Sequence, residues 1–194
     1  MSSLGARWSS ARVLILILLF VACDLYNFNN DFTPTGTPFN LNSGIKLIAI
    51  AGDRRHFTDN GLFTVAMVCR TTGSATVADT LPPGLLFTSR RNSTQHIIVL
   101  KEHRFTVGAS NTTVIVGVFC CNRYRQIPTE SDTFDLGPFT DNYELRQVAD
   151  IVRNKNIAND LGLVQRAVWM ITDSTGLNQA YIDSLNALPG ESGS

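Results

Sequence analysis

The feature that most constrains the fold is a run of β-branched and apolar residues at positions 112–122, TTVIVGVFCCN, which ends in two adjacent cysteines. β-Branched side chains lose rotamer freedom in a helix and pack well on a pleated sheet. The run therefore predicts a central strand of a β-sheet. Before it the chain contains similar strand patterns, and after it the pattern changes to the period of helices.

The segments before this run combine β-branched and apolar residues with turn residues at their ends. They lie at residues 44–51, 62–70, 76–89, 95–100 and 104–107. Within the third segment, Pro82-Pro83-Gly84 predicts a corner between two strands, because proline lacks a backbone donor. About seven short strands at this spacing predict a mainly β fold, an antiparallel β-sandwich over residues 44–122, with a β-barrel as the alternative.

After residue 122 the sequence predicts a loop, because Pro128, Gly137 and Pro138 break regular secondary structure, and then a helical segment. Asp141 and Glu144 have the spacing of a capping pair for a first helix. Apolar stripes predict two or three α-helices up to residue 188. We therefore expect residues 123–188 to form a loop and helical segment that packs on the sandwich, followed by a tail at 189–194.

Composition excludes several classes of function. Sixteen basic residues balance sixteen acidic ones, so no strong field would attract nucleic acid. The sequence contains no P-loop, dinucleotide fingerprint or G-x-S-x-G motif. The spacing of His56, His96 and His103 is not that of a metal site. We therefore expect these histidines to face solvent on strands or turns. We therefore expect no metal, no cofactor and no catalysis, with a hydrolase of unassigned residues as an alternative.

The first residues have the pattern of an export signal. Arg7 and Arg12 precede an apolar run that is too short to span a bilayer, and the run ends at Val21-Ala22-Cys23. This segment resembles a bacterial lipoprotein signal. The resemblance implies that residues 1–22 are removed, that Cys23 is lipidated and that the protein lies in the bacterial cell envelope, outside the cytoplasm. An ordinary cleaved signal or an uncleaved anchor is the alternative.

Residues 23–43 are rich in Asn, Thr, Pro and Gly and show no sustained period. Such a composition predicts a flexible connection between the membrane anchor and the folded domain. The aromatic residues of this segment provide an alternative, in which it runs along the sheet as an edge. These residues are Tyr26, Phe28, Phe32 and Phe39.

The corner sequence also carries a motif. Asp79, Thr80, Leu81, Pro82, Gly84, Leu85 and Phe87 match the pattern D-T-L-P-x-G-L-x-F. In this respect the chain resembles the immunoglobulin-like "conserved repeat" modules of bacterial surface proteins. In those modules the motif marks the point where a strand leaves one sheet and enters the other. The resemblance covers residues 44–122 and implies a scaffold or binding role without catalytic residues.

An exported chain permits disulfides, and three cysteines remain once Cys23 is lipidated. Adjacent residues of a strand point to opposite faces, so we expect one of Cys120 and Cys121 to enter the core. The simplest arrangement is a disulfide between Cys69 and the inward cysteine, with one thiol left over. A vicinal disulfide between Cys120 and Cys121 is the strained alternative.

A second arrangement involves Val164-Gln165-Arg166-Ala167-Val168-Trp169 together with Phe119-Cys120. These two sequences resemble the motifs of bacterial thioester domains, which capture nucleophiles on host surfaces. The resemblance implies that Cys120, or Cys121, donates the sulfur and that Gln165 donates the acyl group. A polar residue at a helix boundary is the structural alternative for Gln165.

We therefore expect a lipid-anchored extracytoplasmic module that acts in binding, adhesion or structure. Its partners would be the membrane, through the lipid, and a protein or glycan surface. Exposed aromatic residues would provide a stacking platform for a sugar, and the candidates are Phe134, Phe139, Tyr143 and Trp169. The alternatives are a covalent adhesin with a Cys120–Gln165 thioester and an extracytoplasmic hydrolase.

Overall fold

The computed structural model describes residues 32–173 and 175–191. The predicted signal at 1–22, the lipidation site Cys23 and the first part of the predicted connection lie outside the described residues. Statements about these segments therefore remain predictions.

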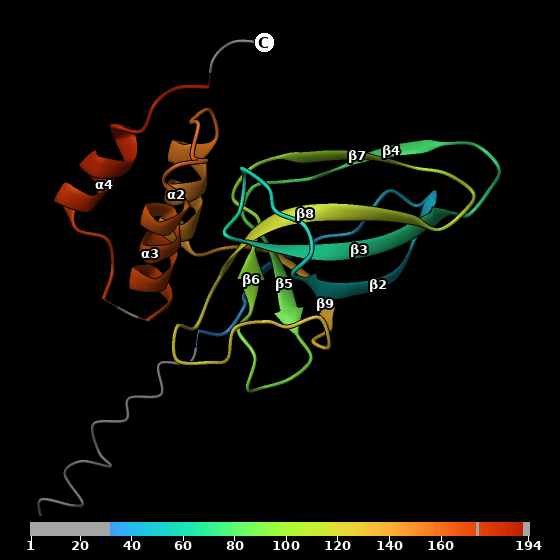
Figure 1. Cartoon of the computed structure of the whole chain (residues 1–194), viewed down its shortest axis with the longest axis horizontal. Coiled ribbons are helices and arrows are strands. Elements are labelled where there is room, and N and C mark those ends of the chain that lie inside the picture. Colours follow the sequence, from blue (N-terminus) through green and yellow to red (C-terminus); the bar gives the residue numbers. More distant parts are fainter. Residues whose placement is uncertain (1–31, 174, 192–194) are drawn as a thin grey trace, which may run out of the picture. The chain divides into compact units, whose positions relative to one another are not determined.

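The described chain is mainly β, as predicted, with helices at its C-terminal end (Figure 1). Seven strands form one antiparallel sheet in the order β1-β9-β5-β6-β8-β3-β2, and β4 pairs with β7 in a second, two-stranded sheet. The strands are β1 (Gly36–Pro38), β2 (Ile45–Asp53), β3 (Phe63–Thr71), β4 (Val77–Leu81), β5 (Leu85–Ser89), β6 (Ile97–Ile98), β7 (His103–Val107), β8 (Thr112–Cys120) and β9 (Phe134–Thr140).

The large sheet curls until its two sides meet. An isolated antiparallel bridge joins Ala51 at the end of β2 to Thr133, the residue before β9. The N–H of Gly52 donates to the carbonyl of Asp132 at 3.0 Å. The curled sheet and the β4–β7 pair enclose the inner core, to which the predicted central strand β8 contributes side chains.

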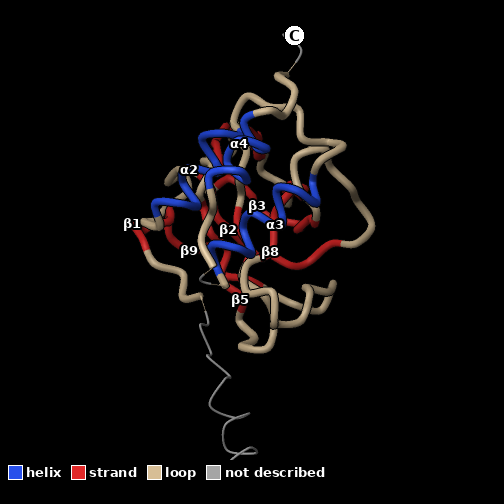
Figure 2. Tube along the Cα trace, turned by 90° about the vertical axis from the view of Figure 1, so that its left-hand side faces the viewer, coloured by secondary structure: helices blue, strands red, loops and turns tan. Residues whose placement is uncertain are grey.

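The helices α2 (Tyr143–Val152), α3 (Leu161–Thr172) and α4 (Gln179–Asn186) gather at one end of the strands, and Figure 2 looks onto them. They cover a second core on the outer face of the sheet. Side chains of β8 alternate between the two cores, as the period of a strand requires. Val114, Val116, Val118 and Cys120 enter the inner core, whereas Phe119 and the following Cys121 enter the outer one.

The predicted corner at Pro82-Pro83-Gly84 is confirmed. β4 ends at Leu81 in the two-stranded sheet, and β5 begins at Leu85 in the large sheet. Gly84 has φ of 92°, a conformation that favours glycine because a Cβ is strained there. The chain therefore changes sheets at the corner motif, while the family that the motif resembles stays a prediction.

Two segments form strands that we did not expect. β9 lies within the predicted loop, where it pairs with both β1 and β5 despite Gly137 and Pro138. Pro138 is tolerated because it lies opposite Pro38 of β1, which also lacks an N–H, and at the point where the pairing of β9 with β5 shifts register. β1 itself lies within the predicted flexible connection at 23–43. Residues 36–38 of that segment therefore lie along the edge of the sheet, as the alternative has it.

Candidate functional site

The residues predicted for a thioester meet where β8 ends against α3. The side-chain nitrogen Nε2 of Gln165 donates to the carbonyl of Cys120 at 2.7 Å. The backbone N–H of Cys120 donates to Oε1 of Gln165 at 2.8 Å. Gln165 is 1% exposed, so both hydrogen bonds are shielded from water. Of the two candidate cysteines, Cys120 is the one whose backbone Gln165 binds.

The sheet explains why Gln165 is needed at this position. Successive residues of an antiparallel strand direct their backbone groups to alternate sides. The N–H of Cys121 donates to His96 beside β6, so the backbone groups of Cys120 face the side of β3. β3 begins only at Phe63, opposite Val118, and does not extend to Cys120. The Gln165 carboxamide takes the place of a strand there, because it offers the same donor and acceptor as a peptide group.

Cys120 and Cys121 face opposite sides of β8, yet both are fully buried. The expectation that only one of them enters a core was wrong, because the helices cover the outer face. Burial raises the pKa of both thiols above their ordinary value. Both are therefore protonated at neutral pH, and neither sulfur is a strong nucleophile in this state.

The predicted disulfide from Cys69 is wrong for the described fold. Cys69, Cys120 and Cys121 are all free thiols. Cys69 pairs with Thr112 at the far end of β8, eight residues from Cys120, which is about 26 Å at the rise of a strand. A disulfide needs Cα atoms within about 7 Å of each other. Burial, with a smaller contribution from Asp79, raises the pKa of Cys69 to about 11.

Two buried polar atoms near the Cys120–Gln165 pair have no hydrogen-bond partner among the described residues. One is Nε1 of Trp169, one turn along α3 from Gln165, and the other is Oδ1 of Asn122. Asn122 also has φ of 58°, which is uncommon for a residue other than glycine. Unpaired buried groups and backbone strain often occur at functional sites. They make this end of β8 a first candidate site.

A second candidate site lies where the loop after β2 faces the loop after β8. It is a pocket of about 400 Å³, hereafter the loop-face pocket. Asp53, Arg54, His56, Phe57, Gly61, Leu62, Phe63, Thr64 and Ile127 line it. Three of its side chains, Phe57, Leu62 and Ile127, are large, apolar and exposed, and Phe57 is 89% exposed. Apolar side chains that gather in a concave site are typical of ligand-binding surfaces.

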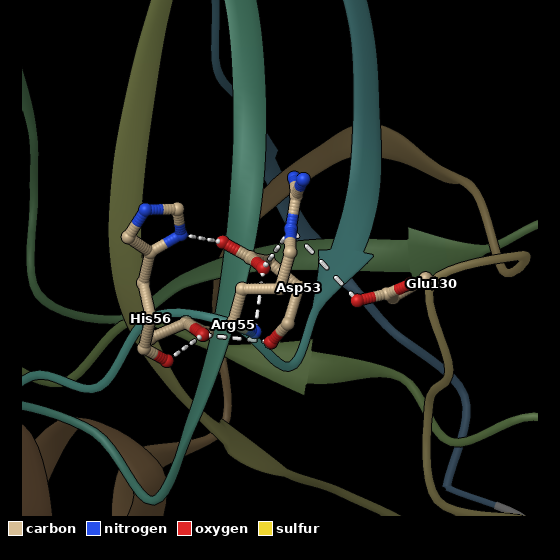
Figure 3. Close-up of polar contacts among 5 residues, drawn as sticks. Asp53, Arg55, His56 and Glu130 are labelled. Carbon is tan, nitrogen blue, oxygen red and sulfur yellow. Dashed lines mark hydrogen bonds and ion pairs between the residues drawn. The ribbon is translucent and has the colours of Figure 1, made fainter.

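The polar wall of the pocket is organised by Asp53 (Figure 3). The Asp53 side chain is only 1% exposed, and its Oδ2 is hydrogen-bonded to Nδ1 of His56. Its Oδ1 accepts from the backbone N–H of Arg55 at 2.9 Å. The Arg55 side chain also lies 3.9 Å from Glu130. Burial alone would raise the pKa of Asp53, but hydrogen bonds with Arg55 and His56 and the charge of His56 outweigh it and lower the pKa.

An aspartate that holds a histidine through Nδ1 is also found in catalytic triads, where the histidine activates a nucleophile. Among the described residues that line the pocket, none is a serine or a cysteine. The hydroxyl of Thr64 donates to the carbonyl of Asp53 at 2.7 Å and so is engaged in holding the loop. The hydrolase hypothesis therefore gains no nucleophile here.

Sequence reasoning assigned no function to the connection between the predicted strands at 44–51 and 62–70, and it missed the pocket. The available signal was the position of Phe57 and Leu62, two large apolar residues on either side of the Asn60-Gly61 turn, where polar residues are usual. The histidine prediction holds only for His56. His96 is half-buried and its Nδ1 accepts from the N–H of Ser89 at 3.0 Å, and burial lowers the pKa of His103.

The aromatic residues proposed as a sugar platform do not form one surface. Phe134 is buried, Trp169 packs on the inner core, and Phe139 is half-buried. Tyr143 is exposed, and it lines a separate shallow groove of about 560 Å³ on α2 and α4 with Arg146, Gln147, Asp150, Ile151 and Asn186.

No protein-family model, curated protein or solved structure matches this chain. Among the helices that the structure describes, none is long and apolar enough to cross a membrane.

Proposed function

We propose that the protein is a non-catalytic binding module of the bacterial cell envelope, held outside the cytoplasm by a lipid on Cys23. The loop-face pocket is its ligand-binding surface. The export and lipid parts of this proposal come from the sequence of residues 1–24. The binding part rests on the pocket.

The observation that carries the proposal is the exposure of Phe57 at the rim of a concave, mostly apolar site. Burying a side chain of this size provides about 1.5–3 kcal/mol, and an isolated domain forgoes that contribution when the ring faces water. A ligand that covers Phe57, Leu62 and Ile127 would gain it. Because the ring is exposed, its contribution to folding is small, which suits a residue that serves binding.

The pocket is tested by titrating the intact protein with the neutral fluorescent dye phenylnaphthylamine. We expect saturable binding that Phe57→Ala weakens roughly tenfold, since the variant removes most of one buried aromatic ring. Tyr143→Ala is the matched control, because Tyr143 is an exposed aromatic residue in the separate groove on α2 and α4. Equal loss in the two variants, or no saturable binding, would contradict the proposal.

The anchor is tested separately by expressing the full chain in a bacterium and fractionating the cells. Lipidation of Cys23 predicts that the protein sediments with membranes and partitions into detergent. Cys23→Ala should release it into the soluble extracytoplasmic fraction or leave the signal uncut. A full chain that stays in the cytoplasm with residues 1–22 attached would exclude the anchor.

The Cys120–Gln165 hydrogen bonds favour a second candidate, a covalent adhesin. In this reaction the Cys120 sulfur attacks Cδ of Gln165, an S–C bond forms, the C–N bond breaks, and the thiol proton leaves with the amide as ammonia. The N–H of Cys120 is already bonded to Oε1, where negative charge develops during the attack. The thioester product would then acylate an amine on a partner.

Intact mass decides between a thioester and a structural Gln165. A thioester lowers the mass by one ammonia, and methylamine restores a covalent adduct. Cys120→Ala should abolish the loss, whereas Cys121→Ala should preserve it, since Gln165 binds the backbone of Cys120. A mature protein of full mass with three titratable thiols in denaturant would exclude the thioester.

A further inference from the structure

We propose that the ligand of the loop-face pocket is an apolar monocarboxylate, whose chain packs on Phe57, Leu62 and Ile127 and whose carboxylate meets Arg54 and His56. This inference rests on the proposed binding function and adds the chemical class of the ligand. It follows from which charges at the pocket already have partners and which do not.

The acidic groups at the pocket are already paired. The buried Asp53 carboxylate binds His56 and the backbone and side chain of Arg55. Glu130 lies outside the lining and faces Arg55. A cationic ligand would have to break these contacts to reach a carboxylate.

Arg54 is the lining cation without an acidic partner. Its guanidinium donates to the carbonyl of Pro128 at 3.3 Å, and within the part of the chain that the structure describes no carboxylate is paired with it. A guanidinium has five donors, so one bond to a carbonyl leaves most of them available. A carboxylate is the ligand group that matches this geometry best.

His56 supplies a second polar contact. Because Asp53 holds Nδ1, the other ring nitrogen, Nε2, remains on the far side of the ring from Asp53 (Figure 3). The His56 side chain is 53% exposed and lines the same pocket as Arg54. In the imidazolium form both ring nitrogens carry a proton, so Nε2 can donate to a ligand while Nδ1 donates to Asp53. Arg54 and His56 thus provide the polar contacts of the pocket that Asp53 and Thr64, already engaged in hydrogen bonds of their own, do not provide.

The size of the pocket limits the ligand. A volume of about 400 Å³ lies near the lower end of the range for small-molecule sites. It suits a medium-length hydrocarbon or a single aromatic ring with one polar group, rather than a large cofactor. Octanoate is therefore an appropriate probe, and octanol and octylamine have the same chain with a neutral and a cationic head.

The test measures displacement of bound phenylnaphthylamine from the intact protein by these three compounds. We expect octanoate to displace the dye at roughly tenfold lower concentration than octanol, which corresponds to one charge-assisted hydrogen bond. Octylamine should be the weakest. Arg54→Gln should reduce the advantage of octanoate over octanol severalfold, because only the contact with His56 then remains for the carboxylate.

Arg153→Gln is the matched control, because Arg153 is an exposed arginine on the helical side, paired with Asp150. It should keep the full preference for octanoate. Equal displacement by octanoate and octanol, or a preference for octanoate that Arg54→Gln leaves unchanged, would overturn the carboxylate inference. Saturable dye binding in the same experiment would still support the pocket as a binding site. Stronger displacement by octylamine would overturn it in favour of a cationic ligand. Failure of the dye to bind at all would overturn the proposed function instead.

Discussion

At the scale of single residues, the start of α2 is held by Asn142, the N-cap, whose Oδ1 accepts from the N–H of Leu145 at 3.0 Å. The two residues whose spacing predicted a capping pair, Asp141 and Glu144, have other partners. Asp141 instead accepts from the hydroxyl of Thr35, beside β1. Glu144 binds the N–H of Leu177 at 3.0 Å before α4. The local pattern located the helix, while tertiary contacts decided the role of each polar residue.

This assignment predicts that Asn142→Ala lowers the free energy of unfolding by about 1 kcal/mol, the usual contribution of an N-cap. Asp141→Ala should have a smaller effect, because its partner Thr35 is exposed. Urea unfolding of both variants provides the measurement. A larger loss of stability for Asp141→Ala than for Asn142→Ala would show that Asp141 caps the helix, as the sequence indicated.

Asp53 predicts how stability depends on pH. Its pKa in the folded protein is below the ordinary value of 3.8, so the ionised form is stabilised by folding. That stability is fully present above 3.8 and is lost as the pH falls through the lower, folded pKa. Asp132 contributes in the same window, because hydrogen bonds from Thr129 and Thr94 and the charge of Arg91 outweigh burial and lower its pKa.

We therefore expect the free energy of unfolding to fall as the pH drops below 3.8, and to fall less steeply in Asp53→Asn than in the unchanged protein. Urea unfolding across this window measures the slope. Asp135→Asn is a control, since Asp135 is an exposed partner of Arg90. An identical slope with and without Asp53 would show that its pKa is not lowered by folding.

At the scale of elements, the junction of β8 and α3 depends on one side chain that substitutes for a strand. Gln165→Ala leaves the N–H and carbonyl of Cys120 buried without their partner. We expect a loss of about 2–6 kcal/mol, because each of the two orphaned buried groups costs about 1–3 kcal/mol. Hydrogen exchange of the Cys120 amide should accelerate together with the loss measured by urea unfolding.

Arg166→Ala is the control for this prediction, since Arg166 is the exposed neighbour of Gln165 on α3. It should change stability little, consistent with an exposed helical site. A Gln165→Ala protein as stable as Arg166→Ala would mean that the two hydrogen bonds do not hold the junction together.

β1 and β9 show why some elements were not predicted. β9 has Gly137 and Pro138 in its centre, which are the usual signals of a loop, and it forms because strands on both sides pair with it. β1 has no alternating pattern and depends on β9. Strands of this kind are determined by long-range pairing, which a local period does not encode.

The edge assignment of β1 predicts that the segment around it contributes to folding. Phe39 packs against the inner core, so Phe39→Ala should lower the free energy of unfolding by about 2 kcal/mol, roughly half the cost for a fully buried phenylalanine. Thr37→Ala, at an exposed position of β1, should have little effect. Equal stability of both variants in urea would show that Phe39 does not contribute to folding and that this segment is a flexible connection.

At the scale of the whole molecule, the sequence predicted the class of fold, the corner between sheets and the C-terminal helices from strong local periods. It did not predict the loop-face pocket, because that site combines residues 53–64 with Ile127, which are far apart in the chain. The loops meet only once the sheet has curled and β2 has joined the residues before β9. The backbone hydrogen bonds between Cys120 and Gln165 became visible only in the fold, and the thioester that the family resemblance implies stays a prediction.

The most direct test of the central claim, that this molecule binds ligands at the loop-face pocket, is a backbone NMR titration of the intact protein with phenylnaphthylamine. We predict that the largest amide shifts fall within residues 53–64 and at Ile127. The amides of α2 and α4, which flank the separate groove at Tyr143, should move little. Shifts concentrated on those helices, or spread evenly over the described chain, would contradict the claim.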